Sequence, residues 1–343
     1  MQILITGITG RVGANVARQF IEDGHAVRGL VWPGDRQSKK MEAVGAEILE
    51  GDLSSSADVN AAAQDQEAIL HLGAAFQAGG PFTPEQYFDT NVKGTFNILE
   101  AALGLGDRLQ HVFVTSTDAT MSKYPPDGIA EPISETSLPL DSTGWYGYTK
   151  ILCEHLVERY CRGENLKATV FRFANVWGAG EILRFPQFHL DSFVPQYAGR
   201  EDEAGKATYE RLRAESAKDG GPRLIVARDR NGRPWKKHNI EVRDIVHAYR
   251  RALGRPSTYG KTYQLGSDEP FTWDALVPYI AEKTGRPYST VDLAGNPTFY
   301  EYDLSAARSD FGYAPTLSVY DMVDEAVRYA AEGGGGIIPT EVP

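Results

Sequence analysis

The sequence lacks most of the features that mark secreted, membrane-bound or disulfide-stabilised proteins. It contains only two cysteines, Cys153 and Cys161, which lie eight residues apart on one expected helix. Helical rise separates them by about 12 Å, which is too far for a disulfide bond. No apolar run approaches the roughly 20 residues of a membrane span, and the first residues form an apolar strand without a basic leader. We therefore expect a cytoplasmic protein whose cysteines are buried thiols.

Positive charge is also scarce. The chain has 35 lysines and arginines against 46 acidic residues, a formal net charge of −11, which argues against nucleic acid or an anionic membrane as a partner. Its histidines, His189 and His238 among them, are too isolated for a metal site, so we expect no metal. What the sequence does have is an ordinary globular composition, 42% hydrophobic over 343 residues. That is enough for about two domains around a small-molecule site.

A glycine-rich segment follows the first apolar run. Residues 3–6 are expected to form a buried parallel strand, and Gly7, Gly10 and Gly13 lie between it and a helix. The first glycine permits a tight turn, the second lets the backbone approach a pyrophosphate, and the third allows the helix to pack closely on the strand. The first helical amides then face an anion. The predicted dinucleotide site includes Gly7, Thr9, Gly10, Arg11 and Val12.

Tyr146 and Lys150 stand four residues apart at the start of an expected helix, so both lie on one helical face. A tyrosine ordinarily loses its proton near pH ~10 and needs a nearby cation to act as a base at neutral pH. Lys150 supplies that cation, and the hydroxyl of Thr117 could hold the substrate oxygen while Tyr146 moves its proton. We predict that these three residues are the catalytic group of a hydride-transfer enzyme.

Strands alternate with helices through the first half of the chain, which predicts a parallel sheet covered by helices on both faces. We expect a Rossmann-type, doubly wound α/β fold with a smaller C-terminal α+β domain that binds substrate. The Rossmann domain is assigned to residues 1–178, with 238–257 packing back on it, the substrate domain to 179–237 and 258–332, and a flexible tail to 333–343. The expected strands are 3–6, 26–31, 46–50, 68–72, 111–115, 168–172 and 262–265. The expected helices are 12–23, 36–44, 56–63, 84–105, 146–162, 208–218, 272–284 and 318–331.

Taken in order, these motifs resemble those of the extended short-chain dehydrogenase/reductases, whose best-known members are nucleotide-sugar epimerases and dehydratases. The resemblance runs through nearly the whole chain. It rests on the glycine turn, the catalytic group, and the segments 51–53, 70–75, 91–95, 172–178 and 303–308 with Leu317. It implies an NAD(P)-dependent enzyme in which Thr117 and Tyr146 are catalytic and Lys150 also binds the ribose.

The resemblance implies further contacts. In such enzymes, the positions of Asp52 and Leu53 lie by the adenine ring, and those of Leu72, Gly73 and Ala74 end a cofactor-lining strand. The other residues assigned to the cofactor are Trp32, Arg36, Asn91 and Thr115. Asn175 is implied as a substrate contact. Two long helices per subunit, here 84–105 and 146–162, usually form a dimer contact in this family, so we expect a homodimer.

The end of the second strand departs from the family pattern. NAD-preferring members usually place an acid there to bind the ribose hydroxyls, whereas this chain has none before Asp35. NADP-preferring members often place an arginine near Trp32, which is absent, although Arg36, Lys39 and Lys40 could reach a 2′-phosphate. These three residues could equally form a solvated helix face. The sequence therefore favours NADP slightly over NAD and leaves the cofactor unresolved.

The substrate side departs from the pattern as well. Nucleotide-sugar members carry an arginine that binds the diphosphate shortly before a His-Val motif, whereas this chain has the segment 235–244, which includes Lys237. Lysine offers a point charge without the bidentate fork of arginine, so a diphosphate-linked sugar is not assured. Arg184, Arg223 and Lys237 could instead hold a carboxylate or a simple phosphate.

Asp118 and the overall function keep alternatives open. Sugar dehydratases of the family carry their general acid at this position, but the glutamate that follows in those enzymes is Ala119 here. Asp118 is therefore either a general acid or, as we favour, a structural residue of its loop. We predict an epimerase or dehydratase that acts on a sugar or nucleotide sugar by transient hydride abstraction and return, with Tyr146 as base. The alternatives are a plain NAD(P)-dependent dehydrogenase or reductase and a non-catalytic cofactor sensor, against which the intact catalytic group argues.

Overall fold

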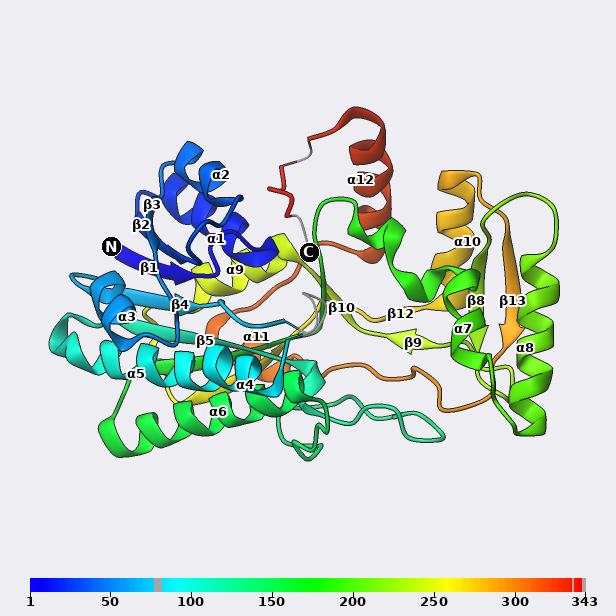
Figure 1. The fold of residues 1–343 in the computed structure, drawn as a ribbon, viewed down its shortest axis with the longest axis horizontal. Coiled ribbons are helices and arrows are strands. Elements are labelled where there is room, and N and C mark those ends of the chain that lie inside the picture. Colours follow the sequence, from blue (N-terminus) through cyan, green and yellow to red (C-terminus); the bar gives the residue numbers. More distant parts are fainter. Residues whose placement is uncertain (77–81, 335, 341–343) are drawn as a thin grey trace.

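A seven-stranded parallel sheet forms the larger lobe of the protein (Figure 1). The computed structural model describes residues 1–76, 82–334 and 336–340. The central strands are buried along almost their whole length, as parallel strands covered on both faces must be. The order across the sheet is β11 (Lys261–Leu265), β6 (Ala168–Phe173), β5 (His111–Thr117), β4 (Ala68–His71), β1 (Gln2–Thr6), β2 (Ala26–Val31) and β3 (Glu47–Glu50). The predicted doubly wound, Rossmann-type fold is confirmed.

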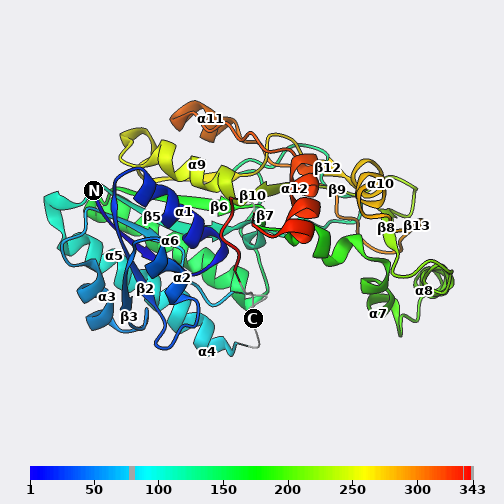
Figure 2. The same ribbon diagram turned by 90° about the horizontal axis from the view of Figure 1, so that it is seen from above.

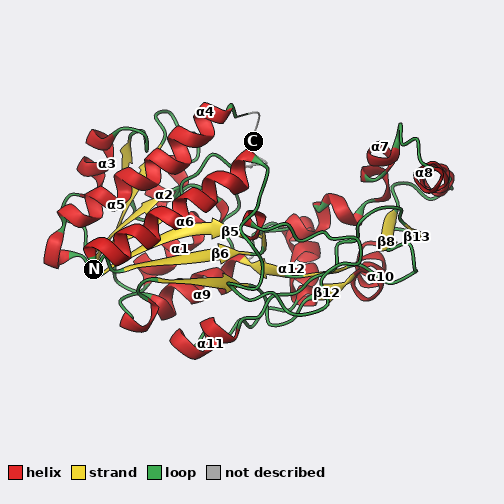
Figure 3. Cartoon of the chain, turned by 90° about the horizontal axis from the view of Figure 1, so that it is seen from below, coloured by secondary structure: helices red, strands yellow, loops and turns green. Residues whose placement is uncertain are grey.

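Helices cover both faces of this sheet (Figures 2 and 3). One face carries α1 (Arg11–Glu22) and α9 (Val242–Ala252), which pack together, and the other carries α3 (Ser56–Ala63), α5 (Gly94–Gly104) and α6 (Trp145–Glu164). The short helix α2 (Ser38–Ala43) packs beside β3. The helix expected over 84–105 is interrupted, because a π-helical segment, η1 (Phe88–Lys93), joins α4 (Pro84–Tyr87) to α5. In the described part of the chain, no helix is long and apolar enough to cross a membrane.

Strand β11 corrects the predicted extent of the substrate domain. Residues 258–332 were assigned to that domain, but β11 pairs in parallel with β6 as an edge strand of the large sheet. The helix α11 (Ser305–Phe311) packs on β11 and joins the core of the same lobe. The physical reason is that α9 acts as a crossover helix, which returns the chain to the sheet in parallel with its neighbour.

The remaining elements form a smaller lobe (Figure 1). It is built around its own aromatic core. Trp177, Phe188, Trp235, Phe271 and Trp273 pack there edge to face or tilted. Its helices are α7 (Val194–Tyr197), α8 (Glu203–Ser216), α10 (Trp273–Thr284) and, toward the larger lobe, α12 (Val319–Glu332). Its strand pairs are β8 (Leu224–Arg228) with β13 (Tyr288–Asp292), β9 (Lys236–Lys237) with β12 (Phe271–Thr272), and β7 (Asn175–Trp177) with β10 (Asn239–Glu241).

The segment after α12 differs from the flexible tail that the sequence predicts. Its described residues return to the larger lobe, where Ile338 and Thr340 contact α1 and the glycine turn. Gly335 and residues 341–343 lie outside the described residues. The segment is held because its backbone finds polar side chains on α1 and α2, which periodicity in the sequence does not reveal.

Candidate active site

The glycine turn between β1 and α1 has the shape that the sequence predicts. Gly7 has a φ of +67°, and a Cβ atom there would lie 2.7 Å from the backbone nitrogen of Gly73. A Cβ atom on Gly13 would lie 2.2 Å from the Gly7 carbonyl, so only glycine allows this approach of helix to strand. Gly10 caps α1 without any side-chain hydrogen bond, which leaves the first helical amides for an anion. This cradle fits a dinucleotide pyrophosphate.

An acid does stand beside this turn, although it comes after the end of β2. The hydroxyl of Thr9 donates to Asp35 Oδ2 at 2.7 Å, and Asp35 Oδ1 accepts from the Gln37 backbone at 2.8 Å. The loop after β2 therefore folds back and brings the carboxylate to the glycine turn. Trp32 and Arg36, which we assigned to the cofactor, are both exposed.

The segments that follow β3 and β4 lie beside the glycine turn. Leu53 is buried and lies close to Gly73, and Asp52 turns its carboxylate to the Ser54 backbone at 2.7 Å, at the start of α3. The hydroxyl of Thr6 accepts from the backbone of Gly73 at 3.0 Å, which holds the segment that includes Leu72 and Ala74 against the glycine turn.

Asn91 supports this wall from η1. Its side chain accepts from the Ala75 backbone at 2.8 Å, donates to the Ala75 carbonyl at 3.2 Å, and donates to Thr149 at 3.0 Å. The amide is therefore saturated by protein partners, and Asn91 is 1% exposed. The side chain thus joins the end of β4 to α6, and the assignment of Asn91 to the cofactor stays a prediction.

The predicted catalytic group comes together where β5 meets α6. Thr117 ends β5, and its hydroxyl hydrogen-bonds with Tyr146. Gly147 allows the approach, because a Cβ atom there would lie 2.3 Å from the Ala119 carbonyl. Lys150, 2% exposed, donates its ammonium to the carbonyl of Thr115 at 2.9 Å. The hydroxyl of Thr115 is 2.9 Å from Tyr249, so only its carbonyl contacts the catalytic group.

The pKa of Tyr146 is set by burial in this arrangement. Burial raises the pKa of the phenol above its usual value, and the hydrogen bond with Thr117 opposes that rise. Burial also lowers the pKa of Lys150. The lowering of the Tyr146 pKa by Lys150, which the sequence suggests, stays a prediction.

A buried ion pair holds α6 against the sheet behind the catalytic group. Glu154, one turn after Lys150, receives hydrogen bonds from Arg172 on β6 at 2.9 Å and 2.6 Å, and a further one from the hydroxyl of Ser116. Both charges are less than 10% exposed. Because the pairing is bidentate and shared with β5, it fixes the distance between α6 and the end of that strand.

Asp118 does not face the cleft as a free acid. Its carboxylate lies 2.9 Å from the ammonium of Lys123 and accepts a hydrogen bond from Tyr302 at 2.7 Å. Burial by itself would raise the pKa of Asp118, but Lys123 and Tyr302 hold it below its usual value. The carboxylate is therefore ionised at neutral pH, which agrees with the structural role that we favoured.

The residues assigned to substrate differ in how they are placed. Lys237 on β9 is 6% exposed, lies 3.3 Å from Gln187 Oε1, and faces the ring of Phe185. Among the residues that the structure describes it has no ion pair, and burial lowers its pKa to about 8. Asn175 on β7 is half-buried, whereas Arg184 is exposed on the short 3₁₀ helix after it. Of the described residues assigned to substrate, Lys237 is a buried charge that makes no ion pair, although Asp118 lies near enough to favour its charged form.

Arg11 is also engaged by protein. Its guanidinium pairs with Glu181 at 2.5 Å, and Glu181 accepts from the Gly178 backbone at 2.7 Å. This ion pair joins the glycine turn to the segment that enters the smaller lobe. Arg11 therefore borders the predicted cofactor cleft as one member of a bridge between the lobes.

Three residues of this site were missed in the sequence. Lys123 follows Asp118 by five residues, a spacing without a helical or strand meaning. Tyr302 is separated from Asp118 by 184 positions, and Asp35 lies beyond the strand end where an acid is expected. Of these three residues, only Asp35 could have been found from the sequence, because it is the first acidic residue after β2.

A model of the NAD-dependent epimerase/dehydratase family matches residues 3–266, from the first strand of the sheet to its last. The chain belongs to this family. Membership agrees with the cradle at the glycine turn and gives the protein a nicotinamide cofactor. The enzyme and the family that the motifs predict are both confirmed.

Relatives in this family are similar over most of their length. The chain is 27% identical over 325 residues to a dTDP-glucose 4,6-dehydratase of Mycolicibacterium smegmatis, covering 92% of this chain and 88% of the relative. It is 30% identical over 315 residues to a UDP-glucose 4-epimerase of Streptomyces lividans, covering 85% and 92%. A solved short-chain dehydrogenase/reductase superfamily protein from Agrobacterium tumefaciens, with bound NAD, matches with a TM-score of 0.81 and 31% identity over 97% of this chain and 98% of that one.

Proposed function

We propose that this protein is a redox-neutral epimerase of a sugar or nucleotide sugar, with Tyr146 as the base. The observation that carries the proposal is the contact of Tyr146 with Thr117. This contact lies at the carboxyl ends of the parallel strands, where the glycine turn also lies. A phenol and a hydroxyl that adjoin in this way can both contact one substrate oxygen. The intact pair, with Lys150 one helical turn further on, supports catalysis over a purely cofactor-sensing role.

The roles of the side chains follow from their positions. Thr117 orients the substrate hydroxyl, Tyr146 takes the hydroxyl proton as the carbinol is oxidised, and Tyr146 returns that proton when the carbonyl is reduced. A nicotinamide bound at the glycine turn would supply the hydride acceptor and donor for this carbon, so the overall reaction would involve no net oxidation. Lys150 holds positive charge at the buried end of α6, which favours the phenolate.

The state of Asp118 supports epimerisation over dehydration. Elimination of water needs a proton donor for the departing hydroxyl. Asp118 is ionised and already engaged by Lys123 and Tyr302, so it is a poor donor. Dehydration would need another acid in the cleft, and the sequence offers Ala119 where dehydratases carry their next acid.

Asp35 supports NAD over NADP, which revises the slight preference drawn from the sequence. A 2′-phosphate carries close to two negative charges and would meet the carboxylate that Thr9 holds at the turn. Ribose hydroxyls, by contrast, can donate to a carboxylate. Arg36 is exposed, and Lys40 already donates to the Pro339 carbonyl, so neither supports a preference for the phosphate.

Lys237 supports an anionic group in the substrate. A buried ammonium without a carboxylate partner is costly unless a ligand supplies the countercharge. A diphosphate or a sugar carboxylate would both do so. Homodimerisation and a cytoplasmic location remain part of the proposal.

A labelling experiment tests the proposal. We expect a sugar substrate carrying deuterium at the oxidised carbon to give a product that retains the label at that carbon, without an accumulating absorbance of reduced cofactor. Migration of deuterium to a neighbouring carbon would indicate a dehydratase. Stoichiometric NADH with a released keto product would overturn the proposal and favour the plain dehydrogenase.

A further inference from the structure

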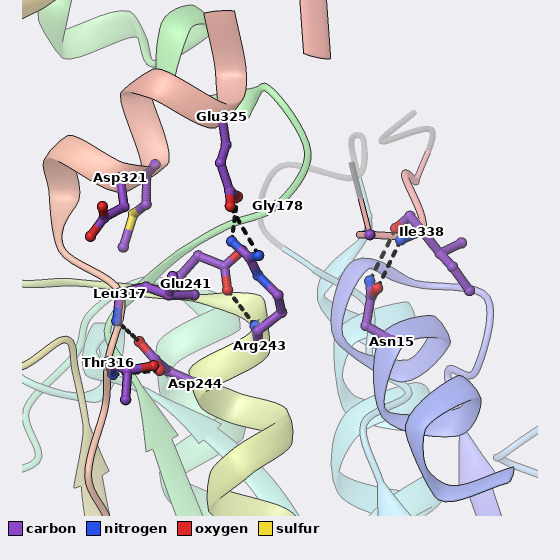
Figure 4. A network of polar contacts seen from close by, with 12 residues as sticks. Asn15, Gly178, Glu241, Arg243, Asp244, Thr316, Leu317, Asp321, Glu325 and Ile338 are labelled. Carbon is purple, nitrogen blue, oxygen red and sulfur yellow. Dashed lines mark hydrogen bonds and ion pairs between the residues drawn. The ribbon is translucent and has the colours of Figure 1, made fainter. Parts of the chain in front are cut away.

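Residues 336–340, which we call the C-terminal strap, are bound to α1 by a two-point contact. The backbone N–H of Ile338 donates to Asn15 Oδ1 at 2.7 Å, and Asn15 Nδ2 donates to the Ile338 carbonyl at 3.0 Å. Figure 4 shows this pair of bonds, with Asn15 rising from α1 toward the strap. Asn15 is 1% exposed. One buried amide thus reproduces the pairing that a neighbouring strand would provide.

The strap continues onto the glycine turn and the segment after β2, which would flank the adenosine end of a bound dinucleotide. The hydroxyl of Thr340 lies 3.3 Å from the carbonyl of Thr9, in the glycine turn, and 3.2 Å from Gln37 Oε1. The ammonium of Lys40 donates to the Pro339 carbonyl at 3.0 Å. The strap therefore joins the glycine turn to the loop and helix that follow Asp35.

The preceding residues combine a fixed base with a hinge. Arg243 on α9 binds Glu325 of α12, and Asp244 accepts from the Thr316 backbone at 2.9 Å, so α12 is anchored to the larger lobe (Figure 4). After α12, Gly333, Gly334 and Gly336 all have φ between +66° and +79°. Residues other than glycine rarely adopt these backbone angles. Glycine at these positions allows the backbone to change direction between α12 and the strap.

Ile337, at the base of the strap, is 9% exposed and borders a cavity. This cavity of about 270 Å³ lies between α12, the segment that includes Gly178, and Ile337. The strap is held mainly by polar contacts, which include a hydrogen bond from Arg18 to the Gly336 carbonyl and those at residues 338–340, and Ile338 also packs partly against the core of the larger lobe. Such a segment can detach at its tip while α12 stays in place.

We propose that the C-terminal strap is a wall of the dinucleotide site, which closes over the adenosine half of the bound cofactor and slows its release. The inference rests on the proposed function only in requiring that NAD binds at the glycine turn. The strap bridges the two segments that flank the adenosine ribose, so the cofactor must pass it to leave. A redox-neutral enzyme benefits from such retention, because its cofactor is regenerated in every turnover.

The test measures release of NADH from the full-length enzyme and from a chain that ends at Gly334. NADH is detected by energy transfer from tryptophan, and its release is followed in stopped flow after a chase with excess NAD. We expect release to become at least about tenfold faster without the strap, which corresponds to the loss of one or two net hydrogen bonds. Unchanged or slower release would overturn the proposal.

A matched pair of point variants separates the strap from general damage to the fold. Thr340→Val removes the hydroxyl with little change of shape and should speed release, whereas Thr340→Ser keeps the hydroxyl and should not. Hydrogen exchange gives a second measurement, because the amide of Ile338 should exchange more slowly once NADH is bound. If this amide is unaffected by NADH, the strap does not cover the site. Binding is measured without turnover, so an enzyme that binds NADH but fails to epimerise would contradict only the proposed function.

Discussion

Asp118 and Lys123 form an ion pair 2.9 Å long inside the candidate active site, with 14% and 4% of their side chains exposed. The Lys123 ammonium also donates to the Asp118 carbonyl at 2.7 Å, and Tyr302 binds the same carboxylate. The pair closes the loop that follows Thr117. An aspartate held in this way is a poor proton donor, which supports the structural role proposed for Asp118.

Removing one member of this pair should destabilise the protein without abolishing epimerisation. Asp118→Asn leaves a buried ammonium without its countercharge, so we expect the free energy of unfolding to fall by about 3 kcal/mol. Denaturant unfolding measures it. Asp127→Asn is the control, because Asp127 is 86% exposed and pairs only at the surface. Activity of Asp118→Asn at low temperature should stay near wild type, and its complete loss would assign Asp118 to the chemistry.

Tyr146 should carry the proton transfer. Tyr146→Phe keeps the ring and its edge contact with Phe76 but removes the hydroxyl, so we expect kcat to fall by about 10² to 10⁴. The dissociation constant of NAD should stay near wild type. Steady-state kinetics and calorimetric titration measure the two quantities. A Tyr146→Phe enzyme with full activity would exclude this tyrosine as the base.

Asp35 should set the choice between the two dinucleotides. We expect the wild-type enzyme to bind NAD more tightly than NADP, because the carboxylate beside Thr9 repels a 2′-phosphate. Asp35→Asn keeps a hydrogen-bond acceptor and removes the charge, and should therefore narrow or reverse the preference. Titration of the wild-type and Asp35→Asn enzymes with NAD and NADP measures this preference. A wild-type preference for NADP that is lost in Arg36→Ala would favour the exposed arginine instead.

Lys237 should give substrate binding a dependence on pH. Burial lowers its pKa to about 8, so the ammonium is present below pH 8 and is lost as the pH rises through that value. Affinity for an anionic substrate should therefore weaken up to about tenfold between pH 7 and pH 9. Lys237→Arg is the matched control, because arginine stays charged over this range and should remove the dependence. The same decline in Lys237→Arg would show that another group titrates.

The helices of the catalytic face should form a homodimer. Phe88 and Phe96 are 47% and 43% exposed on η1 and α5, and Trp145 and Tyr148 are 49% and 47% exposed on α6. In a two-fold symmetric interface, each of these side chains would be buried in both subunits. Light scattering should give about twice the 37.7 kDa chain mass, and Phe96→Glu should shift it to the monomer. A wild-type monomer at micromolar concentration would contradict the contact.

The sequence by itself determined the sheet and the glycine turn, and it predicted which residues gather as the proposed catalytic group. These features depend on local patterns: apolar runs for buried strands, glycines at fixed spacing for a close approach, and a four-residue interval for one helical face. Their effects act within one or two neighbouring elements, which is why Gly7, Gly13, Tyr146 and Lys150 could be assigned. The six expected strands of the first half lie within two residues of the observed bounds for the same reason.

The tertiary structure decided whatever depends on partners far apart in the chain. Only the folded loop after β2 shows that Asp35 reaches Thr9, and only the return of the chain from the smaller lobe places Tyr302 on Asp118. Asn91 could not be recognised as saturated until its partners at Ala75 and Thr149 were in place. The strap contacts Asn15 across 323 positions. Such contacts depend on which side chains lie close enough to bond once the chain has folded. The spacing of residues along the sequence therefore does not predict them.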